Sequence, residues 1–210
     1  MPAITYPIDT EAPAPALPAI DQLNHLIRGR RSVFPQHFSG EVVPREQVEM
    51  ILENAHWAPT HGRTEPWFFH VYSGEGLAQF GELHAKLYKQ HAPADQFSEV
   101  KYETLRTKPT HCSHLIVLCM KRGSNEKIPV IEEIESVACA VQNMALTVAA
   151  LGLGGYWGSG GMTYHPALRD ALGLGPDDQV LGLFHLGVPK AAPAQGLRKT
   201  PWTEHVAWHE

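Results

Sequence analysis

Apolar residues recur at helical spacing along most of the chain. Those that follow Asp21 predict a first helix, which ends at the arginine-rich stretch 28–31. The most apolar helix is expected from Pro129 to about Leu151. Because nearly every side of it is apolar, we expect it to lie inside the domain or at a subunit interface. The other predicted helices begin behind Pro44, cover residues 77–88, cover residues 94–107 more weakly, and begin behind Pro166.

Shorter apolar segments have the length and composition of β-strands. Residues 67–72 are aromatic and β-branched, and residues 114–120 form the continuous apolar run typical of a strand buried on both faces. Residues 179–187 form a further strand, and the glycine-rich stretch 152–161 is predicted as a turn. Helices that join a few strands predict an α+β domain, a three-layer α/β/α arrangement around a small central sheet. Such long helical connections fit neither a β-sandwich nor a barrel.

Length and composition predict one compact domain over residues 20–210. The chain has 210 residues, of which 43% are hydrophobic and 19% charged, enough apolar material for a sizeable core. Residues 1–19 are rich in proline and alanine. This composition predicts an extended or disordered arm, with a segment that wraps a partner subunit as the alternative.

The charge balance limits the partners that the protein can bind, and the cysteines indicate its compartment. A formal net charge of −5 argues against nucleic acid or an anionic membrane as partner, yet leaves room for a small anion held by a few arginines. No apolar run approaches the roughly 20 residues of a membrane span, and the first residues lack the pattern of a signal peptide. Three cysteines are too few and too odd in number for a disulfide framework, so we expect a cytoplasmic protein.

The segment RGRRS, residues 28–32, is the first candidate for binding chemistry. Guanidinium groups fork onto phosphate or carboxylate oxygens, and the serine hydroxyl adds a neutral hydrogen bond. Arginines at the end of a helix also offset the negative end of its dipole, so a purely structural role explains one or two of them equally well.

The loop APTHGRTEP, residues 58–66, is the second candidate. Its two end prolines stiffen a short segment that presents Thr60, His61, Arg63 and Glu65 just before a strand. Loops held between rigid flanks often carry binding groups. An ordinary polar surface loop is the alternative interpretation.

The stretch GLGGYWGSGG, residues 152–161, is the third candidate. Six glycines in ten residues let the backbone approach a flat or charged ligand closely, with Tyr156 and Trp157 beside it. The stretch does not match the dinucleotide fingerprint, because Trp157 stands where the last glycine belongs and the stretch follows a helix.

Metal and hydrolase chemistry find little support in the sequence. The 13 histidines are scattered, and His111, Cys112 and His114 lack the spacing of a zinc site, so we expect no metal. A nucleophile elbow of the form G-x-S-x-G is absent.

Taken in order, the three segments resemble the nitroreductase family of flavin enzymes over residues 21–189. Residues 30–32 resemble the family's R-x-S phosphate contact, and APTHGRTEPWFF resembles its A-P-S-x-x-N-x-Q-P-W loop. The long helix with Gln142 and Asn143, and the glycine-rich stretch after it, resemble the interface helix and the flavin-facing turn. His61 matches the histidine in the A-P-x-H-x-x-x-x-P-W pattern of the small single-domain NAD(P)H nitroreductases.

The resemblance implies an FMN-binding homodimer with a flavin at each subunit interface and a small central mixed sheet. It implies transfer of hydride from NADH or NADPH through the flavin to a nitroaromatic, quinone or enone, in a ping-pong cycle without a protein acid or base. Catalytic residues are therefore expected to be none. The residues that it assigns to the flavin are Arg30, Arg31, Ser32, Trp57, His61, Tyr156, Trp157 and Gly158, with Arg198 or Lys199 on the phosphate.

Three positions depart from the family pattern. Arg63 stands where the wider family has Asn, Glu65 where it has Gln, and Phe34 where many members have a Lys near the flavin O2 edge. Reduced flavin accumulates negative charge at N1 and C2=O, so a nearby cation should stabilise it. Arg63 is the candidate for that cation.

Two other functions fit the same resemblance. One is related flavin chemistry on the same scaffold, such as dehalogenation, because a fold does not fix a reaction. The other is a flavin-binding or sensing protein without turnover. A domain that binds no ligand at all, with the glycines serving only packing, is a third alternative.

Overall fold

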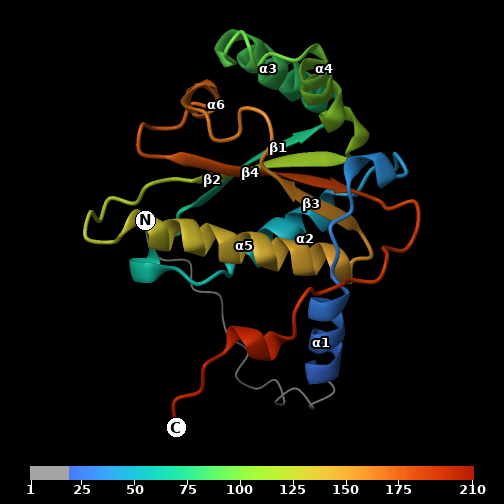
Figure 1. Cartoon of the computed structure of the whole chain (residues 1–210), viewed down its shortest axis with the longest axis vertical. Coiled ribbons are helices and arrows are strands. Elements are labelled where there is room, and N and C mark those ends of the chain that lie inside the picture. The colour runs from blue at the N-terminus through green and yellow to red at the C-terminus, as the bar shows by residue number, and fades with distance from the viewer. Residues whose placement is uncertain (1–18) are drawn as a thin grey trace.

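The computed structural model describes residues 19–210, so the predicted arm over residues 1–19 lies outside it except for Ala19 (Figure 1). The helices nearly match the expected ones: α1 is Ala19–Gly29, α2 Arg45–His56, α3 Glu75–His91, α4 Glu99–Thr107, α5 Val130–Ala150 and α6 Pro166–Ala171. Pro44 and Pro129 each stand one residue before their helix, in an extended conformation that sets the direction of entry. Four short 3-10 helices cover Pro35–His37, His61–Arg63, Lys108–His111 and Trp202–His205.

Four strands form one sheet in the order β1-β2-β4-β3. Their bounds are Trp67–Ser73 for β1, His114–Met120 for β2, Gly154–Gly158 for β3 and Gln179–Gly187 for β4. Every neighbouring pair of these strands is antiparallel, which corrects the expected mixed sheet. The hairpin of α3 and α4 brings the chain back to the end of the sheet that β1 left, so β2 must run the other way. Outside the strands, the isolated bridge between Ser32 and Gly155 is parallel, and the one between Phe38 and Pro189 is antiparallel.

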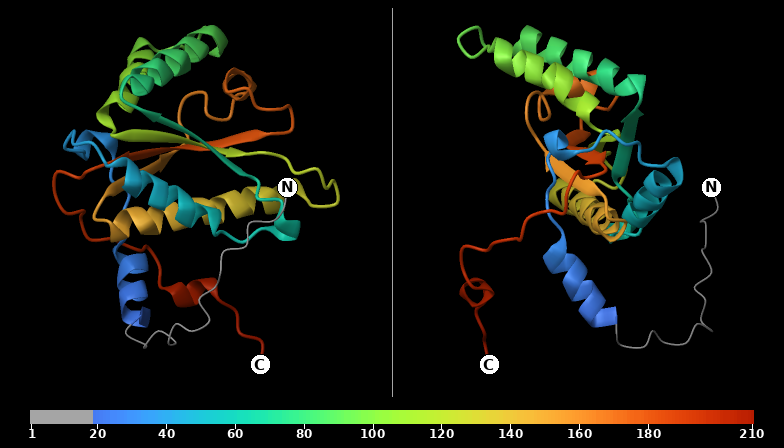
Figure 2. Two further views of the ribbon diagram at one scale, coloured as in Figure 1. Left: turned by 180° about the vertical axis from the view of Figure 1, so that it is seen from behind. Right: turned by 90° about the vertical axis from the view of Figure 1, so that its right-hand side faces the viewer.

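The sheet is the middle layer of three, as the α+β, α/β/α expectation required. In Figures 1 and 2, α2 and α5 cover one face, while α3, α4 and α6 lie over the other. Strand β2 is buried along its whole length between two apolar clusters, one under α2 and α5 and one under α3 and α6. The continuous apolar run 114–120 is therefore a strand buried on both faces, as its pattern predicted.

The glycine-rich stretch contains a strand, so the predicted turn over its whole length was wrong. A Cβ added at Gly155 would lie 2.6 Å from Cζ of Phe184, and one at Gly154 would lie 2.7 Å from Cε1 of Phe38. These glycines therefore allow β3 to pack closely against its neighbours rather than to reverse direction.

Helix α1 and the tail after β4 project from the three-layer body (Figure 2). Ile20, Leu23 and Ile27 on α1 are each about half exposed, at 50%, 46% and 47%. In the tail, Trp202 and Trp208 are more exposed still. Such a display of large apolar side chains is typical of a surface that another chain covers.

Candidate functional site

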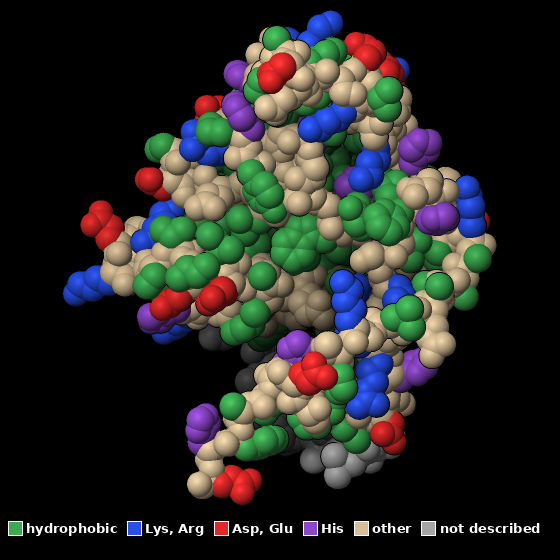
Figure 3. Space-filling view, viewed as in Figure 1, with side chains coloured by type: hydrophobic (Ala, Val, Ile, Leu, Met, Phe, Trp, Pro, Cys, Tyr) green, Lys and Arg blue, Asp and Glu red, His purple; other side chains and the backbone are tan. Residues whose placement is uncertain are grey.

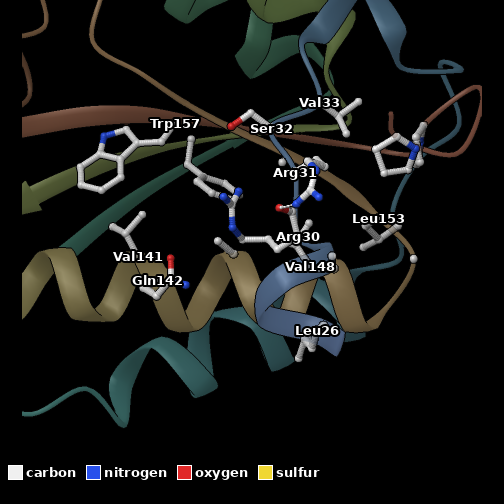
Figure 4. Close-up of a pocket in the computed structure, with 18 of the residues that line it drawn as sticks. Leu26, Arg30, Arg31, Ser32, Val33, Val141, Gln142, Val148, Leu153 and Trp157 are labelled. Carbon is white, nitrogen blue, oxygen red and sulfur yellow. Dashed lines mark hydrogen bonds between the residues drawn. The ribbon is translucent and has the colours of Figure 1, made fainter. Parts of the chain in front are cut away.

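A well-formed large cavity, of about 400 Å³, lies between the end of α1, the second half of α5 and strand β3 (Figure 4). Figure 4 shows Arg30 and Ser32 from the segment after α1, Trp157 from β3, and Val141, Gln142 and Val148 from α5 around it. Its volume falls in the range of small-molecule and cofactor sites. Four of the predicted site residues line it: Arg30, Arg31, Ser32 and Trp157.

Arg30 provides a cation at this cavity. Its side chain is partly buried and has no carboxylate within ion-pair distance among residues 19–210. Its backbone N–H donates to the carbonyl oxygen of Leu26, which places the residue at the last turn of α1. An uncompensated guanidinium at a cavity wall suits an anionic ligand.

Arg31 is engaged within the chain. Its Nη1 donates to the carbonyl oxygens of Arg28 and Arg30, at 2.6 Å and 2.8 Å. Its guanidinium lies against the backbone of Gly196, where an added Cβ would be 2.1 Å from Cζ. Arg31 thus closes the end of α1 and holds the tail, which is the structural role that the sequence left open for one of the arginines.

Strand β3 directs its two aromatic residues to opposite faces. The indole of Trp157 lines the large cavity and donates from Nε1 to the carbonyl oxygen of Leu181 at 3.2 Å. Tyr156 points the other way and packs on Phe34, with ring centroids 4.4 Å apart. Alternation along a strand explains the separation, which could not be foreseen while the segment was predicted as a turn.

A second cavity, of about 40 Å³, lies at the end of β3 and includes the predicted residue Gly158. His84, Lys108 and His185 share it, and none of them was a candidate from the sequence. Lys108 comes from the 3-10 helix after α4, and its Nζ lies 4.9 Å from the centroid of the Tyr156 ring. Only His84 had a sequence signal, as one of the residues on the buried stripe of α3.

The two histidines of the second cavity are held neutral. Burial, with smaller contributions from nearby lysines, lowers the pKa of His84 and of His185 to about 4. Nε2 of His84 accepts the backbone N–H of Met162 at 2.8 Å, and Nδ1 of His185 lies 3.3 Å from the carbonyl oxygen of Tyr156.

The loop 58–66 adopts a strained conformation at the opposite end of α5 from the large cavity. Arg63 and Glu65 both have positive φ, 55° and 45°, which is uncommon for residues with a Cβ. Nδ1 of His61 lies 2.5 Å from a carboxylate oxygen of Glu132 in the first turn of α5. Trp57, at the end of α2, is largely exposed. The structure therefore does not bring Trp57, His61 or Arg63 to the cavity that Arg30 lines.

Arg198 and Lys199 lie in the exposed tail and do not line the large cavity. Nη1 of Arg198 donates to the carbonyl oxygen of Leu197 at 3.1 Å. Pro189 and Pro193, which precede them, do reach the cavity wall.

Two further expectations can be compared with the described part of the chain. Residues 19–210 hold no group of three His, Cys, Asp or Glu side chains arranged to bind a metal ion. Within the same residues, no helix has both the length and the apolar character needed to span a bilayer. The cysteines are unpaired, and burial raises the pKa of Cys112 and Cys119 to about 12.

The layered fold and the cavity between α1, α5 and β3 fit the family that the sequence motifs resemble. The chain belongs to the nitroreductase family, whose sequence model matches residues 27–188. The matched range includes the loop 58–66 and every residue of the small cavity. It also includes the lining of the large cavity, except for His25 and Leu26 in α1 and Pro189 and Pro193 in the tail.

Individual relatives agree with this assignment. The chain is 33% identical over 163 residues to the Escherichia coli protein "Putative NAD(P)H nitroreductase YdjA", a match that covers 78% of this chain and 87% of the relative. A nitroreductase-like family protein from Bacillus cereus superposes with a TM-score of 0.76 at 27% identity, over 90% of this chain and 96% of that one. The FMN-dependent nitroreductase NfnB from Mycobacterium smegmatis, solved in complex with NADPH, shares the fold at 17% identity, with a TM-score of 0.69 over 91% of this chain and 100% of its own.

Proposed function

We propose that this protein is an FMN-dependent oxidoreductase that transfers hydride from NADH or NADPH to a nitroaromatic, quinone or enone in a ping-pong cycle. The observation that carries the proposal is Arg30, a cation at the wall of a cavity of about 400 Å³ in a chain of the nitroreductase family. Within residues 19–210, no carboxylate pairs with it. The name of the E. coli relative, an NAD(P)H nitroreductase, supports the choice of electron donor.

The cavity has the chemistry that FMN needs. Its polar end carries Arg30 and the Ser32 hydroxyl at the last turn of α1, which suits the phosphate and the ribityl chain. Its α5 wall carries Val141, Ala145 and Val148, which suit a flat apolar ring system. When bound, FMN supplies the two-electron chemistry by accepting hydride from the nicotinamide and giving it to the acceptor.

The protein's own contribution is binding, orientation and exclusion of water. Arg30 would hold the phosphate, and Trp157 with the glycine backbone of β3 would lie along the ring. No side chain is required to move a proton, so we propose that the protein itself has no catalytic residue. Because all three cysteines are unpaired thiols, we also retain the cytoplasm as the location.

A homodimer would complete the site. His61 lies near the start of α5, whereas the large cavity lies along its second half. From Glu132 to Val141, the first α5 residue in the cavity wall, an α-helix rises by about 14 Å, so the His61 end of α5 lies outside the cavity of its own chain. A second copy related by a two-fold axis, with its α5 running the other way, would place its Trp57, His61 and Arg63 over this cavity.

The exposed apolar surface supports the same assembly. Hydrophobic side chains gather across the middle of the face shown in Figure 3. The projecting α1 and tail add Leu23, Trp202 and Trp208, which a partner would cover. A tail fixed in this way would let Arg198 or Lys199 reach a phosphate.

Flavin uptake and turnover test the proposal. Purified protein should acquire the visible absorbance of bound FMN and should oxidise NADH or NADPH when menadione or a nitroaromatic is added. Arg30→Ala should weaken FMN binding by about 3 kcal/mol, on the order of 100-fold, because charge-assisted contacts are lost. Arg28→Ala, on the exposed side of the same helix, is the matched control and should bind FMN as the wild type does.

Each alternative has its own outcome. Protein that takes up no FMN contradicts the proposal and favours a domain without this ligand. Tight FMN binding without turnover favours a sensing or storage role. Reductive loss of halide from a halogenated aromatic, faster than nitro or quinone reduction, favours dehalogenation on the same scaffold.

A further inference from the structure

Lys108 is a half-buried cation without a counter-ion. It opens the 3-10 helix Lys108–His111 between α4 and β2. No carboxylate lies within ion-pair distance of its Nζ in the part of the chain that the structure describes. Its Nζ lies over the face of the Tyr156 ring, 4.9 Å from the centroid. Burial lowers the pKa of Lys108, which reflects the cost of keeping a charge there.

The surroundings of Lys108 leave its charge uncompensated. The cavity of about 40 Å³ that it lines has room for about one water molecule. His84 and His185, the other titratable groups in its wall, are neutral at pH 7. Across this small space lie Gly158 and Gly160. The Tyr156 ring that Lys108 approaches lies beside Gly158, where an added Cβ would be 2.9 Å from its Cε1, so this ring links the ammonium to the end of β3.

Strand β3 also forms the wall of the large cavity. Gly155 and Trp157 line that cavity, and Tyr156 stands between them with its ring on the opposite face. Lys108 therefore lies behind the strand along which the proposed function places the flavin ring. The backbone of β3 and the Tyr156 ring lie between the cation and that side of the wall.

We propose that Lys108 is a positioning residue that tunes the cofactor, favouring reduced over oxidised FMN from behind β3. The inference rests on the proposed function. Hydride adds two electrons and one proton to the ring, so the ring gains one negative charge. A fixed cation in a partly buried position lowers the energy of that added charge and has little effect on the neutral oxidised ring.

Lys108 matters for the charge at the cavity because Arg63, the other candidate cation, does not reach it in the same chain. Arg63 was the expected cation, but it lies in the loop at the far end of α5, and a partner chain would have to supply it. Phe34, at another of the positions that depart from the family pattern, packs on the same Tyr156 ring that Lys108 approaches. Lys108 thus supplies a cation from within the chain that builds the cavity.

The reduction potential of the bound flavin tests the proposal. In Lys108→Met holoprotein, we expect the ratio of affinities for reduced and oxidised FMN to fall about tenfold. That ratio corresponds to a midpoint potential lower by about 30 mV for a two-electron couple. The affinity for oxidised FMN, measured by fluorescence titration, should change little. Lys108→Arg keeps the charge and should restore the potential.

Lys101→Met is the matched control. Lys101 also lies over a tyrosine ring, 4.7 Å from the centroid of Tyr88, but at the exposed surface of α4 and outside the wall of the small cavity. Its removal changes the net charge equally and should leave the potential as in the wild type.

Three results would overturn the proposal. One is a Lys108→Met potential equal to that of the wild type, and another is an equal shift in Lys101→Met. If Lys108→Met does not fold, Lys108→Gln replaces it, and an unchanged potential there counts equally. The third is wild-type protein without FMN, which removes the proposed function as well. An unchanged potential in FMN-loaded variants removes this inference alone.

Discussion

The indole of Trp157 lies against the backbone of Gly182, in the space that a side chain at position 182 would occupy. A Cβ added there would be 1.8 Å from Nε1 of Trp157. Because the indole is also held by its hydrogen bond to Leu181, it cannot give way without losing that bond. The orientation of Trp157 at the large cavity therefore depends on a glycine in the neighbouring strand.

Gly182→Ala should displace the indole and weaken FMN binding. We expect a stability loss of about 1–3 kcal/mol from overpacking, together with a changed tryptophan emission spectrum. Chemical denaturation and FMN titration measure the two effects. Gly76→Ala, in α3, is the control and should retain binding, because the nearest atom to an added Cβ is Cδ1 of Tyr72, 3.6 Å away. Normal FMN affinity in Gly182→Ala would show that the orientation of Trp157 is unimportant.

The stability of the protein should fall as the pH is lowered from 6.5 to 4. Burial holds the pKa of His84 and of His185 at about 4, against an ordinary value of 6.5. The unfolded chain thus binds more protons in this window, and stability rises with pH across it. For a single histidine, a pKa difference of this size corresponds to about 3 kcal/mol in the free energy of unfolding. This contribution is present above pH 6.5 and is lost by about pH 4.

Urea denaturation at several pH values checks this expectation. His185→Gln should reduce the slope of stability against pH by about one proton. His209→Gln, in the exposed tail, should leave the slope unchanged. A slope that is the same in all three proteins would mean that His185 does not titrate on unfolding.

Glu133 should be among the most costly carboxylates to remove. Its side chain is 1% exposed, pairs with Nη1 of Arg122 at 2.5 Å and accepts the backbone N–H of Gly123 at 3.0 Å. Glu133→Ala leaves the guanidinium without its partner in a buried setting, so we expect a loss of about 3–5 kcal/mol. Glu103→Ala, which breaks an exposed pair with Arg106, should leave the thermal midpoint nearly unchanged. Similar midpoints in the two variants would contradict the assignment.

Two inactive variants should restore activity when they are combined. Arg30→Ala damages the part of the site at the cavity, and His61→Ala damages the part at the other end of α5. If a second copy supplies the loop, a mixed dimer holds one intact site and one site with both defects. Random mixing of equal amounts should give about a quarter of the wild-type activity at limiting FMN. No recovery after co-refolding would mean that each chain builds its site alone.

The layers and most of the elements could be predicted from periodicity, because long helices and fully buried strands leave strong patterns. Strand β2 and strand β4 match their predicted ranges, and α5 matches to within a residue at each end. Strand β3 was missed because its glycines, which allow close packing, carry the same local signal as a turn.

The candidate site was predictable only where one short segment carries the chemistry. Arg30 and Ser32 could be found, since the arginine-rich stretch ends a helix. Lys108 could not, because its meaning depends on a contact with Tyr156, far away in the sequence. The separation of His61 from the cavity also depends on the length of α5, which no local motif records.

In the proposed dimer, the two parts of the site come from two chains, so cofactor retention should depend on protein concentration. A ligand held by two chains stabilises their association as much as association stabilises its binding. Dilution should then release FMN and separate the subunits in one coupled transition, and added FMN should reverse both. The cell would hold little of this protein as a loaded monomer, and the supply of flavin would set the amount of assembled enzyme.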